Sequence, residues 1–398
     1  MRSLRISVAG GSIGGLTTAV LLHEAGHDVH VYERSTRALE ARGAGIVVLP
    51  MTERYFVEKG TSLGESGTHD PEVALTLTNW NYIDRAGTIT HKAVTNNRFT
   101  SWNTLYRALL AALPPERYHL SSPVTGVELT EVGVAVHIDD RPDHDAELLI
   151  GADGVASTVR EFVAPETTTD YAGYVAWRGT VLESELPVET RAIFEDAMVY
   201  QVLPYSHILI YAIPGARDSI VVGERALNWV WYRNAPEPQF AELMTDRNGE
   251  YRPTTMPPGL LRDRFVDELH TTATELLSPQ FADVVCSCED TFIQAIFDMT
   301  ADRFVRGRAA LIGDAASALR PHVAAGTAKA CADGWALADH LDRAEDLDRA
   351  LSSWEVQQRT LAIEVAEKSA GMGRRSLVEN RMVSGDDEWR FGLFGPGT

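Results

Sequence analysis

The sequence predicts an α/β protein that combines a Rossmann-like domain, a domain with a mostly antiparallel β-sheet, and C-terminal helices. Three observations predict this fold class. A strand, a glycine-rich turn and a helix follow one another at the N-terminus, and strand-like alternation fills the middle of the chain. Another strand, followed by Gly-Asp and helical sequence, lies around Gly313. With 398 residues, the chain has room for about two or three domains.

The N-terminal unit has the strongest local pattern. Residues 5–8 and 28–32 show the alternation of strands, and residues 15–25 place Ala, Leu and Val on one face of a helix. A strand, a helix and a strand at this spacing form a βαβ unit with parallel strands. This is the unit on which dinucleotide sites are built.

The turn inside this unit fits the pattern G-x-x-x-x-G, with Gly10 and Gly15 at its ends and Gly14 as an additional glycine. Ser12 stands at the middle position, where a glycine normally lets a pyrophosphate approach the backbone. Glu33 closes the second strand, where an acidic residue binds ribose hydroxyls. The turn therefore predicts a nucleotide whose ribose carries free hydroxyls, and a purely structural strand-to-helix turn is the alternative.

The remaining elements follow from the same two periodicities. Strand-like stretches are 70–99, which looks like an insertion, 134–138, 147–151, 171–201, 207–213 and 308–312. Helical stretches are 105–113, 261–277 and 347–368. The tail after Gly371 is rich in Gly, Arg and Asp, and we expect it to be loose.

Composition narrows the classes of partner. The net charge of −20 disfavours nucleic acid, because phosphate binding depends on Lys and Arg. No apolar stretch approaches the roughly 20 residues that cross a bilayer, so no membrane span is predicted. Cys286, Cys288 and Cys331 have neither disulfide-framework nor zinc-ligand spacing, which favours a reducing cytoplasm.

Two further segments repeat the order of strand, Asp and helix. They are GADGVAS, residues 151–157, and LIGDAA, residues 311–316. Either one alone could be an N-capped helix that follows a strand. Together with the N-terminal turn, and in this order, they resemble the FAD-dependent aromatic hydroxylases, the flavoprotein monooxygenases related to p-hydroxybenzoate hydroxylase. The resemblance spans nearly the whole chain, and YAGYVAWRG and RPHVAAGTAKA are most similar to the branch that contains 2,6-dihydroxypyridine 3-hydroxylase.

The resemblance implies that the Rossmann-like domain binds FAD. Glu33 would hold the adenosine ribose, Arg107 would reach the pyrophosphate, and Asp314 would accept a ribityl hydroxyl. The helix that starts at Gly326 and Thr327 would direct backbone amides at the flavin. The implied cofactor-binding residues are Gly10, Ser12, Ile13, Gly14, Gly15, Glu33, Arg34, Arg42, Gly45, Arg107, Val124, Asp153, Asp314, Gly326 and Thr327.

The resemblance also implies a division into domains. A discontinuous FAD-binding domain would comprise residues 1–69, 98–168 and 289–345. Residues 70–97 and 169–288 would form the substrate domain, and residues 346–398 the C-terminal helix and tail. The periodicity of the C-terminal helix fits either packing on its own domain or a homodimer contact.

The implied reaction is the hydroxylation of an aromatic or heteroaromatic ring, such as a phenol or a hydroxypyridine. NAD(P)H would reduce FAD, and the reduced flavin would capture O2 as a C4a-hydroperoxide that transfers oxygen to the ring. The same chemistry could serve epoxidation or Baeyer-Villiger oxidation, because fold does not fix the reaction. A non-catalytic flavin-binding redox sensor is the alternative from a different class.

The substrate pocket is expected between the middle sheet and the loop of residues 320–326. Its candidate residues are Tyr200, His207, Tyr211, Trp229, Trp231, Arg320 and His322. His322 is the catalytic candidate, because an imidazole that titrates near neutrality could take a proton from a hydroxylated ring. A hydrogen bond within the loop is the structural alternative. Arg178 and Arg320 could anchor an anionic group, or each could form a structural ion pair.

Overall fold

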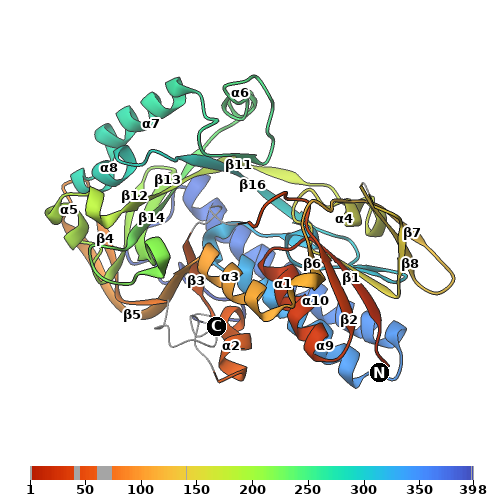
Figure 1. The fold of residues 1–398 in the computed structure, drawn as a ribbon. Coiled ribbons are helices and arrows are strands. Elements are labelled where there is room, and N and C mark those ends of the chain that lie inside the picture. Colours follow the sequence, from red (N-terminus) through yellow and green to blue (C-terminus); the bar gives the residue numbers. More distant parts are fainter. Residues whose placement is uncertain (1, 40–44, 61–73, 140, 396, 398) are drawn as a thin grey trace.

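Two large β-sheets organise the chain in a computed structural model, which describes residues 2–39, 45–60, 74–139, 141–395 and 397 (Figure 1). The strands of the first sheet, in spatial order, are β17 (Val305–Arg306), β18 (Ala309–Leu311), β10 (Leu148–Gly151), β1 (Arg5–Ala9), β2 (Asp28–Tyr32) and β6 (Tyr118–His119). All its neighbouring strands run parallel except β17. This sheet contains the expected βαβ unit.

The second sheet is larger and mostly antiparallel, and its one parallel pairing joins β12 to β4. Its strands, in spatial order, are β15 (Thr255–Met256), β16 (Phe292–Thr300), β11 (Asp170–Leu182), β14 (Ala226–Asn234), β13 (Ser206–Ile213), β12 (Ala197–Leu203), β4 (Leu75–Ile83), β5 (Ile89–Ser101) and β3 (Gly45–Val48), with β19 (Ser317–Ala318) paired to β16. A third, small sheet contains β7 (Val124–Leu129), β8 (Val134–Ile138) and β9 (His144–Ala146).

Helices cover these sheets. The α-helices are α1 (Ile13–Glu24), α2 (Pro50–Glu58), α3 (Trp102–Ala112), α4 (Thr158–Val163), α5 (Val188–Ala192), α6 (Gln239–Leu243), α7 (Asp263–Leu276), α8 (Pro279–Cys286), α9 (Gly326–Arg343) and α10 (Leu347–Leu377). Short 3-10 turns are η1 (Pro115–Arg117), η2 (Glu183–Glu185), η3 (Ala216–Asp218), η4 (Gly313–Ala315) and η5 (Pro321–Val323). Helix α1 packs against α9 and α3, which explains why Leu16, Ala19 and Val20 are all fully buried.

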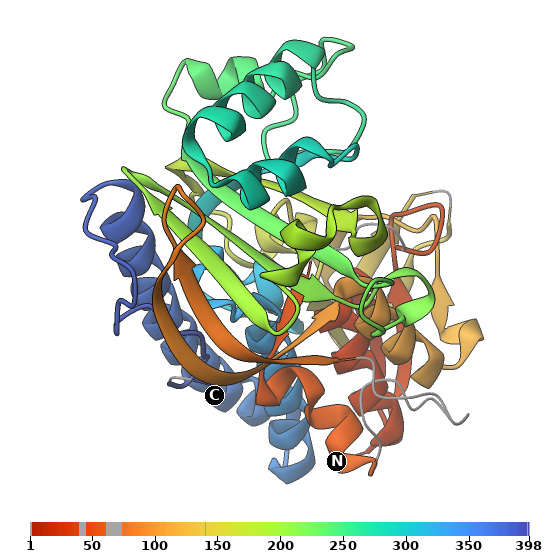
Figure 2. The same ribbon diagram turned by 90° about the vertical axis from the view of Figure 1, so that its left-hand side faces the viewer.

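The large sheet is buried on both faces. Because side chains alternate along a strand, Val175 and Trp177 of β11 pack toward α7 and α8, whereas Tyr174 and Ala176 face α10 and the turn η5. Figure 2 shows the teal helices α7 and α8 on the outer side of this sheet, with the C-terminal helices on its other side. The inner face, on the side of Tyr174, therefore meets the parallel-sheet half of the molecule.

The fold class predicted from the sequence is confirmed, and β2 and β8 begin and end at the predicted residues. The expectation of a loose tail is wrong. Helix α10 continues to Leu377, and Trp389, Phe391 and Leu393 are buried against the large sheet. The domain boundaries stay a prediction, and β3, which lies within residues 1–69, pairs with β5 at the edge of the large sheet.

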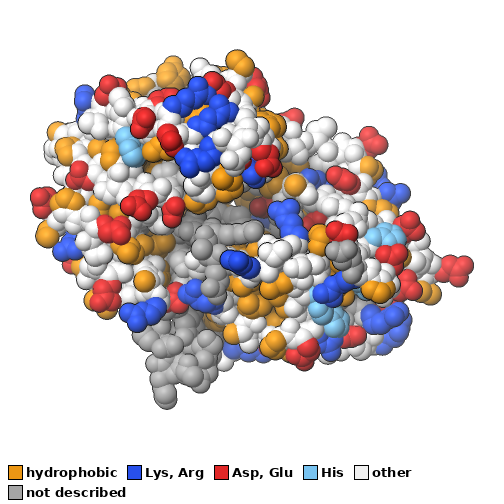
Figure 3. All heavy atoms as spheres, turned by 45° about the horizontal axis from the view of Figure 1, so that its top comes forward, with side chains coloured by type: hydrophobic (Ala, Val, Ile, Leu, Met, Phe, Trp, Pro, Cys, Tyr) orange, Lys and Arg blue, Asp and Glu red, His pale blue; other side chains and the backbone are white. Residues whose placement is uncertain are grey.

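Surface charge, helix character and the cysteines relate to the partner classes considered from the composition. On the face shown in Figure 3, Lys and Arg side chains lie in separate small groups among Asp and Glu. Across the described ranges, no helix combines the length and the apolar character that a membrane span needs. The cysteines Cys286, Cys288 and Cys331 are all free thiols.

Candidate active site

The three motif segments meet at one edge of the parallel sheet. They follow β1, β10 and β18, which are neighbours and run in the same direction. Since the carboxyl ends of parallel strands lie at the same edge, the turns after them come together. Two cavities, of about 610 and about 400 Å³, lie along this edge and share Ser12, Trp102, Ala152 and Gly154 in their walls.

The glycines of the first turn are required by packing. Gly10 has a φ of +102°, and a Cβ there would lie 2.3 Å from the carbonyl oxygen of Ala152. A Cβ on Gly15 would lie 2.0 Å from the carbonyl oxygen of Gly10. Ser12 occupies the N-cap of α1 without a side-chain capping bond, so its hydroxyl is available to a ligand.

The larger cavity is the place expected for the adenosine half of FAD. Glu33, Arg34, Val124 and Asp153 line it. The Glu33 carboxylate is 5% exposed and is fixed by the backbone amides of Gly11 and Ser35, each at 2.9 Å. Each carboxylate oxygen has a second lone pair, so this arrangement leaves acceptors for ribose hydroxyls.

Asp153 mainly holds its own loop together. Its carboxylate accepts hydrogen bonds from the Ser157 hydroxyl and from the backbone amide of Val159. Ser157 in turn caps α4 by accepting from the amide of Arg160. Burial raises the pKa of the Asp153 carboxyl above its ordinary value. Residues 151–157 therefore form an N-capped helix start after a strand, as the structural alternative predicts, and they also border the cavity.

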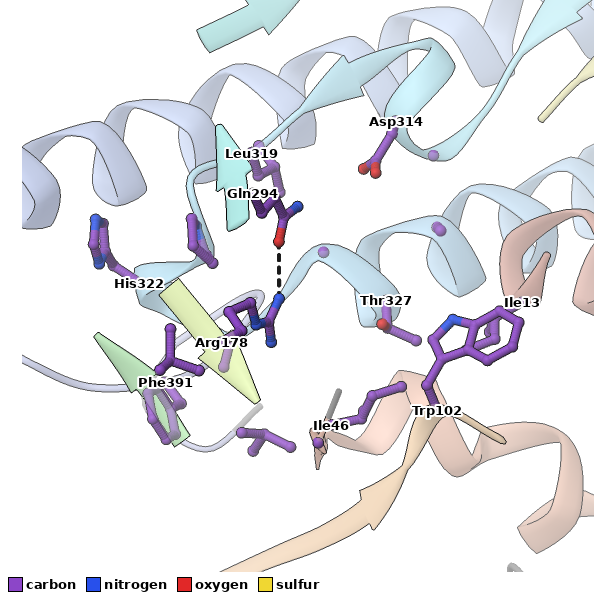
Figure 4. A pocket seen from close by; sticks show the side chains of 18 of the residues that line it. Ile13, Ile46, Trp102, Arg178, Gln294, Asp314, Leu319, His322, Thr327 and Phe391 are labelled. Carbon is purple, nitrogen blue, oxygen red and sulfur yellow. Dashed lines mark hydrogen bonds between the residues drawn. The ribbon is translucent and has the colours of Figure 1, made fainter. Parts of the chain in front are cut away.

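Most of the other implied cofactor residues line one end of the smaller cavity. Ile13, Gly14, Gly45, Asp314, Gly326 and Thr327 line it. In Figure 4, the side chains of Asp314, Thr327, Ile13 and Trp102 surround one end of this cavity. A Cβ on Gly326 would meet nothing within 4 Å, and the N-terminus of α9 has no side-chain cap. Its first amides are thus free to bind a ligand.

A buried ion pair supports this end of the cavity. Lys329 Nζ lies 2.9 Å from Asp333 Oδ2, and both side chains are at most 1% exposed. The backbone amide of Gly313 donates to the same Asp333 oxygen at 2.8 Å. The pair therefore ties α9 to the Gly-Asp turn that presents Asp314. Desolvation raises the pKa of Asp314, and the charge of Lys329 acts in the opposite direction.

One implied cofactor residue, Arg107, lies elsewhere. Arg107 donates from Nη2 to both oxygens of Asp218 at 2.6 Å, and it lines neither cavity. Its expected role at the pyrophosphate competes with this ion pair. Arg42 lies outside the described residues.

The inner face of the large sheet forms the other end of the smaller cavity. Tyr200, His207 and Tyr211 line it as expected. The expectation that Trp229 and Trp231 line the pocket is wrong. Both are buried in the core beneath α7 and α8. The alternation along β14 instead directs Val230 and Tyr232 into the cavity.

Arg320 is also corrected, since it does not line this cavity. It lies in a separate groove, where its Nε donates to Asp298 Oδ1 at 2.7 Å. The Asp298 carboxylate neutralises the charge of Arg320, so Arg320 forms a structural ion pair and does not anchor an anionic substrate group. Arg178 does line the cavity, and its Nη1 donates to Gln294 Oε1 at 2.8 Å.

His322 lies at the far end of the cavity and is 3% exposed. A hydrogen bond of 2.7 Å joins its Nε2 to Tyr174 Oη, whereas its Nδ1 is buried without a partner. Burial, with smaller contributions from His207 and Arg320, lowers its pKa well below the ordinary value. His322 is therefore neutral at pH 7, and the expectation that its imidazole titrates near neutrality is wrong.

Apart from Arg178, the other titratable side chains of this end are uncharged as well. Burial lowers the pKa of His207 to about 3, and its Nδ1 lies 2.7 Å from Ser376 Oγ. Burial raises the pKa of Tyr211 to about 12 and those of Tyr200 and Tyr232 above their ordinary value. The ring-lined end of the cavity thus presents neutral aromatic walls.

The sequence reasoning missed several cavity residues. They are Tyr232, Gln294, Trp389 and Phe391. Tyr232 follows two tryptophans in a strand whose two faces are both apolar, so the pattern could not assign a face. The aromatic residues in the otherwise polar tail were the available signal for Trp389 and Phe391.

Comparison with known proteins agrees with this geometry. A family model described as FAD binding domain-like matches residues 171–298. The chain is 36% identical to 2,6-dihydroxypyridine 3-monooxygenase of Paenarthrobacter nicotinovorans, over 98% of this chain and 96% of that protein. It is 27% identical to 6-hydroxynicotinate 3-monooxygenase of Pseudomonas fluorescens, over 98% of this chain and 95% of that protein.

Among solved structures, 2,6-dihydroxypyridine-3-hydroxylase from Arthrobacter nicotinovorans superposes with a TM-score of 0.91 at 35% identity. The match covers 98% of this chain and 97% of that one. The similarity is thus full-length in sequence and in fold. The chain belongs to the FAD-dependent aromatic hydroxylases, and it is a flavin monooxygenase that uses NAD(P)H and O2.

Proposed function

We propose that the enzyme hydroxylates a hydroxypyridine or a closely related phenol, bound in the aromatic end of the smaller cavity. The observation that carries this proposal is the position of that chamber. It is continuous with the space beside Asp314 and the uncapped N-terminus of α9, where the flavin is expected. The relatives named above act on pyridine rings, which supports the same substrate class.

The cofactor-binding assignments fit the cavities. The Glu33 carboxylate would accept the ribose hydroxyls, the Ser12 hydroxyl would face the phosphates, and Asp314 would accept a ribityl hydroxyl. The first amides of α9 would stabilise negative charge on the pyrimidine side of the flavin. When bound, FAD supplies hydride transfer from NAD(P)H and activation of O2 for insertion into the ring.

The chain itself must hold the ring and exclude water. Tyr200, Tyr211 and Phe391 enclose the ring-binding end, and Trp389 closes it beside His322. Apolar aromatic walls expel water, which otherwise competes for the activated oxygen. We assign His322 as the catalytic residue of this chamber. Its neutral imidazole borders the chamber, and Tyr174 fixes the orientation of the imidazole.

A substrate screen tests the proposal. Hydroxypyridines and phenols are incubated with the FAD-loaded enzyme and NADH or NADPH, and both cofactor oxidation and product mass are recorded. We expect oxidation coupled to the addition of one oxygen atom for at least one hydroxypyridine. A ring-expanded or epoxide product would favour the alternative oxygenations. Bound FAD without NAD(P)H consumption for any ring would favour the sensor.

The cellular location and the oligomeric state complete the proposal. A cytoplasmic location fits the three free thiols. A homodimer contact through α10 is the alternative that the periodicity leaves open. The apolar residues Leu351, Trp354 and Leu361 pack within this chain, and sedimentation equilibrium tests whether a dimer also forms.

A further inference from the structure

Arg178 introduces a positive charge into the ring-lined end of the cavity. It lies on β11 on the same face as Tyr174 and Ala176, and so it points toward the parallel-sheet half. Figure 4 shows its side chain between His322 and Phe391 on one side and Thr327 and Trp102 on the other, with a hydrogen bond to Gln294. The guanidinium therefore lies between the substrate chamber and the cofactor space.

No carboxylate in the described part of the chain pairs with this guanidinium. Among these residues its one hydrogen-bond acceptor is Gln294, its Nε is buried without an acceptor, and its Cζ lies 5.9 Å from the centre of the Phe292 ring. Throughout the described ranges, no Asp or Glu oxygen comes within 4.0 Å of it. The other sheet arginines differ, since Arg225 is paired with the buried Glu183 and Arg320 with Asp298. Arg178 is only partly buried in the cavity wall, so its charge is free to pair with an anionic ligand that replaces water there.

The surroundings leave this charge uncompensated. Of the described lining residues, Arg178 is the only Arg or Lys, and Asp314 is the only carboxylate. His207, His322 and the lining tyrosines are neutral at pH 7, for the reasons given above. The ring-lined end thus holds a net positive charge among neutral aromatic walls.

We propose that Arg178 binds an ionised oxygen of the ring substrate and that Gln294 holds the guanidinium in place for it. This inference rests on the proposed function and narrows it to rings that carry an acidic hydroxyl. The hydroxyl proton passes to water as the ring enters, and the Nη N–H groups that Gln294 leaves free can bind the oxyanion. A ring oxyanion is richer in electrons than the neutral hydroxyl compound, so the bound form is the form that accepts an electrophilic oxygen.

Ligand binding to the oxidised, FAD-loaded enzyme tests this without turnover. The probe is 2,6-dihydroxypyridine, and its dissociation constant is followed through the flavin absorbance as the pH is varied across the ionisation of the ring hydroxyl. Wild-type binding is expected to tighten as the hydroxyl ionises. The probe 2,6-dimethoxypyridine has no ionisable hydroxyl and should bind weakly, with no such pH dependence.

Variants locate the effect. Arg178→Gln should weaken binding of 2,6-dihydroxypyridine about 10- to 100-fold and remove its pH dependence, because a charged hydrogen bond is lost. Arg178→Lys should keep the pH dependence at reduced affinity, because the charge remains without the fork. Gln294→Leu should also keep the pH dependence. Arg233→Gln is the matched control, because Arg233 lies on β14 of the same sheet and packs over Trp177 and Trp231 on its outer face.

Three results would overturn the proposal. One is unchanged affinity and pH dependence in Arg178→Gln. Another is that Arg178→Gln binds the ring substrate with unchanged affinity but has a shifted flavin reduction potential when no ligand is bound. That result would mean that the guanidinium interacts with the flavin and not with the substrate. The third is pH-independent binding by the wild type, a result that requires no variant to fold. If the wild type binds no hydroxypyridine or phenol, the proposed function itself fails, and the inference fails with it.

Discussion

At the scale of single residues, Ser12 shows how one small side chain adapts a glycine turn. Gly10 and Gly15 leave no room for a side chain, since a Cβ on either would lie 2.0 to 2.3 Å from a backbone oxygen, whereas Ser12 borders both cavities and has no capping role. A hydroxyl there can bond to a phosphate where a bulkier group would block it.

We expect Ser12→Gly to retain FAD and Ser12→Val to bind it about tenfold more weakly or worse, because the branched side chain occupies the phosphate position. Reconstitution of the apoenzyme, followed by flavin fluorescence, measures both affinities. Wild-type affinity in the valine variant would show that the phosphates lie elsewhere.

His322 is expected to act on the ring and not on the cofactor. His322→Phe keeps the aromatic volume and removes both nitrogens, so oxygen transfer should slow by about 10-fold or more while FAD affinity changes little. Single-turnover kinetics of the reduced enzyme with O2 measure the first quantity, and reconstitution measures the second. An unchanged hydroxylation rate would remove His322 from the mechanism.

The buried neutral histidines also link stability to pH. In the unfolded chain His207 takes up a proton below about pH 6.5, but in the folded protein its pKa is about 3. The unfolded state therefore binds more protons between these values, and stability is lost as the pH falls through that window. His207→Asn, which can still bond to Ser376, should reduce the slope of unfolding free energy by about 1.4 kcal/mol per pH unit near pH 5. Urea unfolding at several pH values measures it, and an unchanged slope would contradict the burial of a neutral imidazole.

At the scale of elements, α10 contacts the substrate end of the molecule through small residues. A Cβ on Gly373 would lie 2.5 Å from Tyr174 Oη and 2.9 Å from His322 Nε2. Ser376, one turn further on, bonds to His207. Helix α10 thus supports the chamber.

Two glycines of α10 provide a matched pair. Gly371→Ala meets nothing within 4 Å and should stabilise the protein by about 0.5–1 kcal/mol through helix propensity. Gly373→Ala should instead destabilise it by about 1–3 kcal/mol, because the methyl group displaces Tyr174 and His322. Thermal unfolding of both variants compares them, and equal effects would mean that α10 does not approach this closely.

The same scale shows what the sequence could predict. Local alternation located β2 and β8 to the residue, because strand periodicity is a property of neighbours in sequence. Alternation does not show which face of β14 meets the cavity, so the sequence predicts Trp229 at the position that Tyr232 occupies in the structure. The ion pair of Arg320 and the place of Trp389 in the cavity depend on partners far along the chain, which periodicity does not report.

At the scale of the whole molecule, the fold brings two sheets together around one elongated cavity system. The parallel sheet contributes three turns at one edge, and the inner face of the large sheet contributes a chamber whose aromatic walls are neutral and whose one cation among the described lining residues is Arg178. Reduction of the flavin and oxygenation of the ring can therefore take place at one interface. The central claim is that this interface inserts one atom of O2 into a hydroxylated ring.

Isotope labelling tests that claim most directly. The FAD-loaded enzyme is supplied with NADH or NADPH, 2,6-dihydroxypyridine and 18O2, and the product is analysed by mass spectrometry. We predict one 18O atom in a ring-hydroxylated product for each NAD(P)H consumed in coupled turnover. A product that takes its new oxygen from water, or oxidation of NAD(P)H that yields only hydrogen peroxide with every ring tested, would contradict the account.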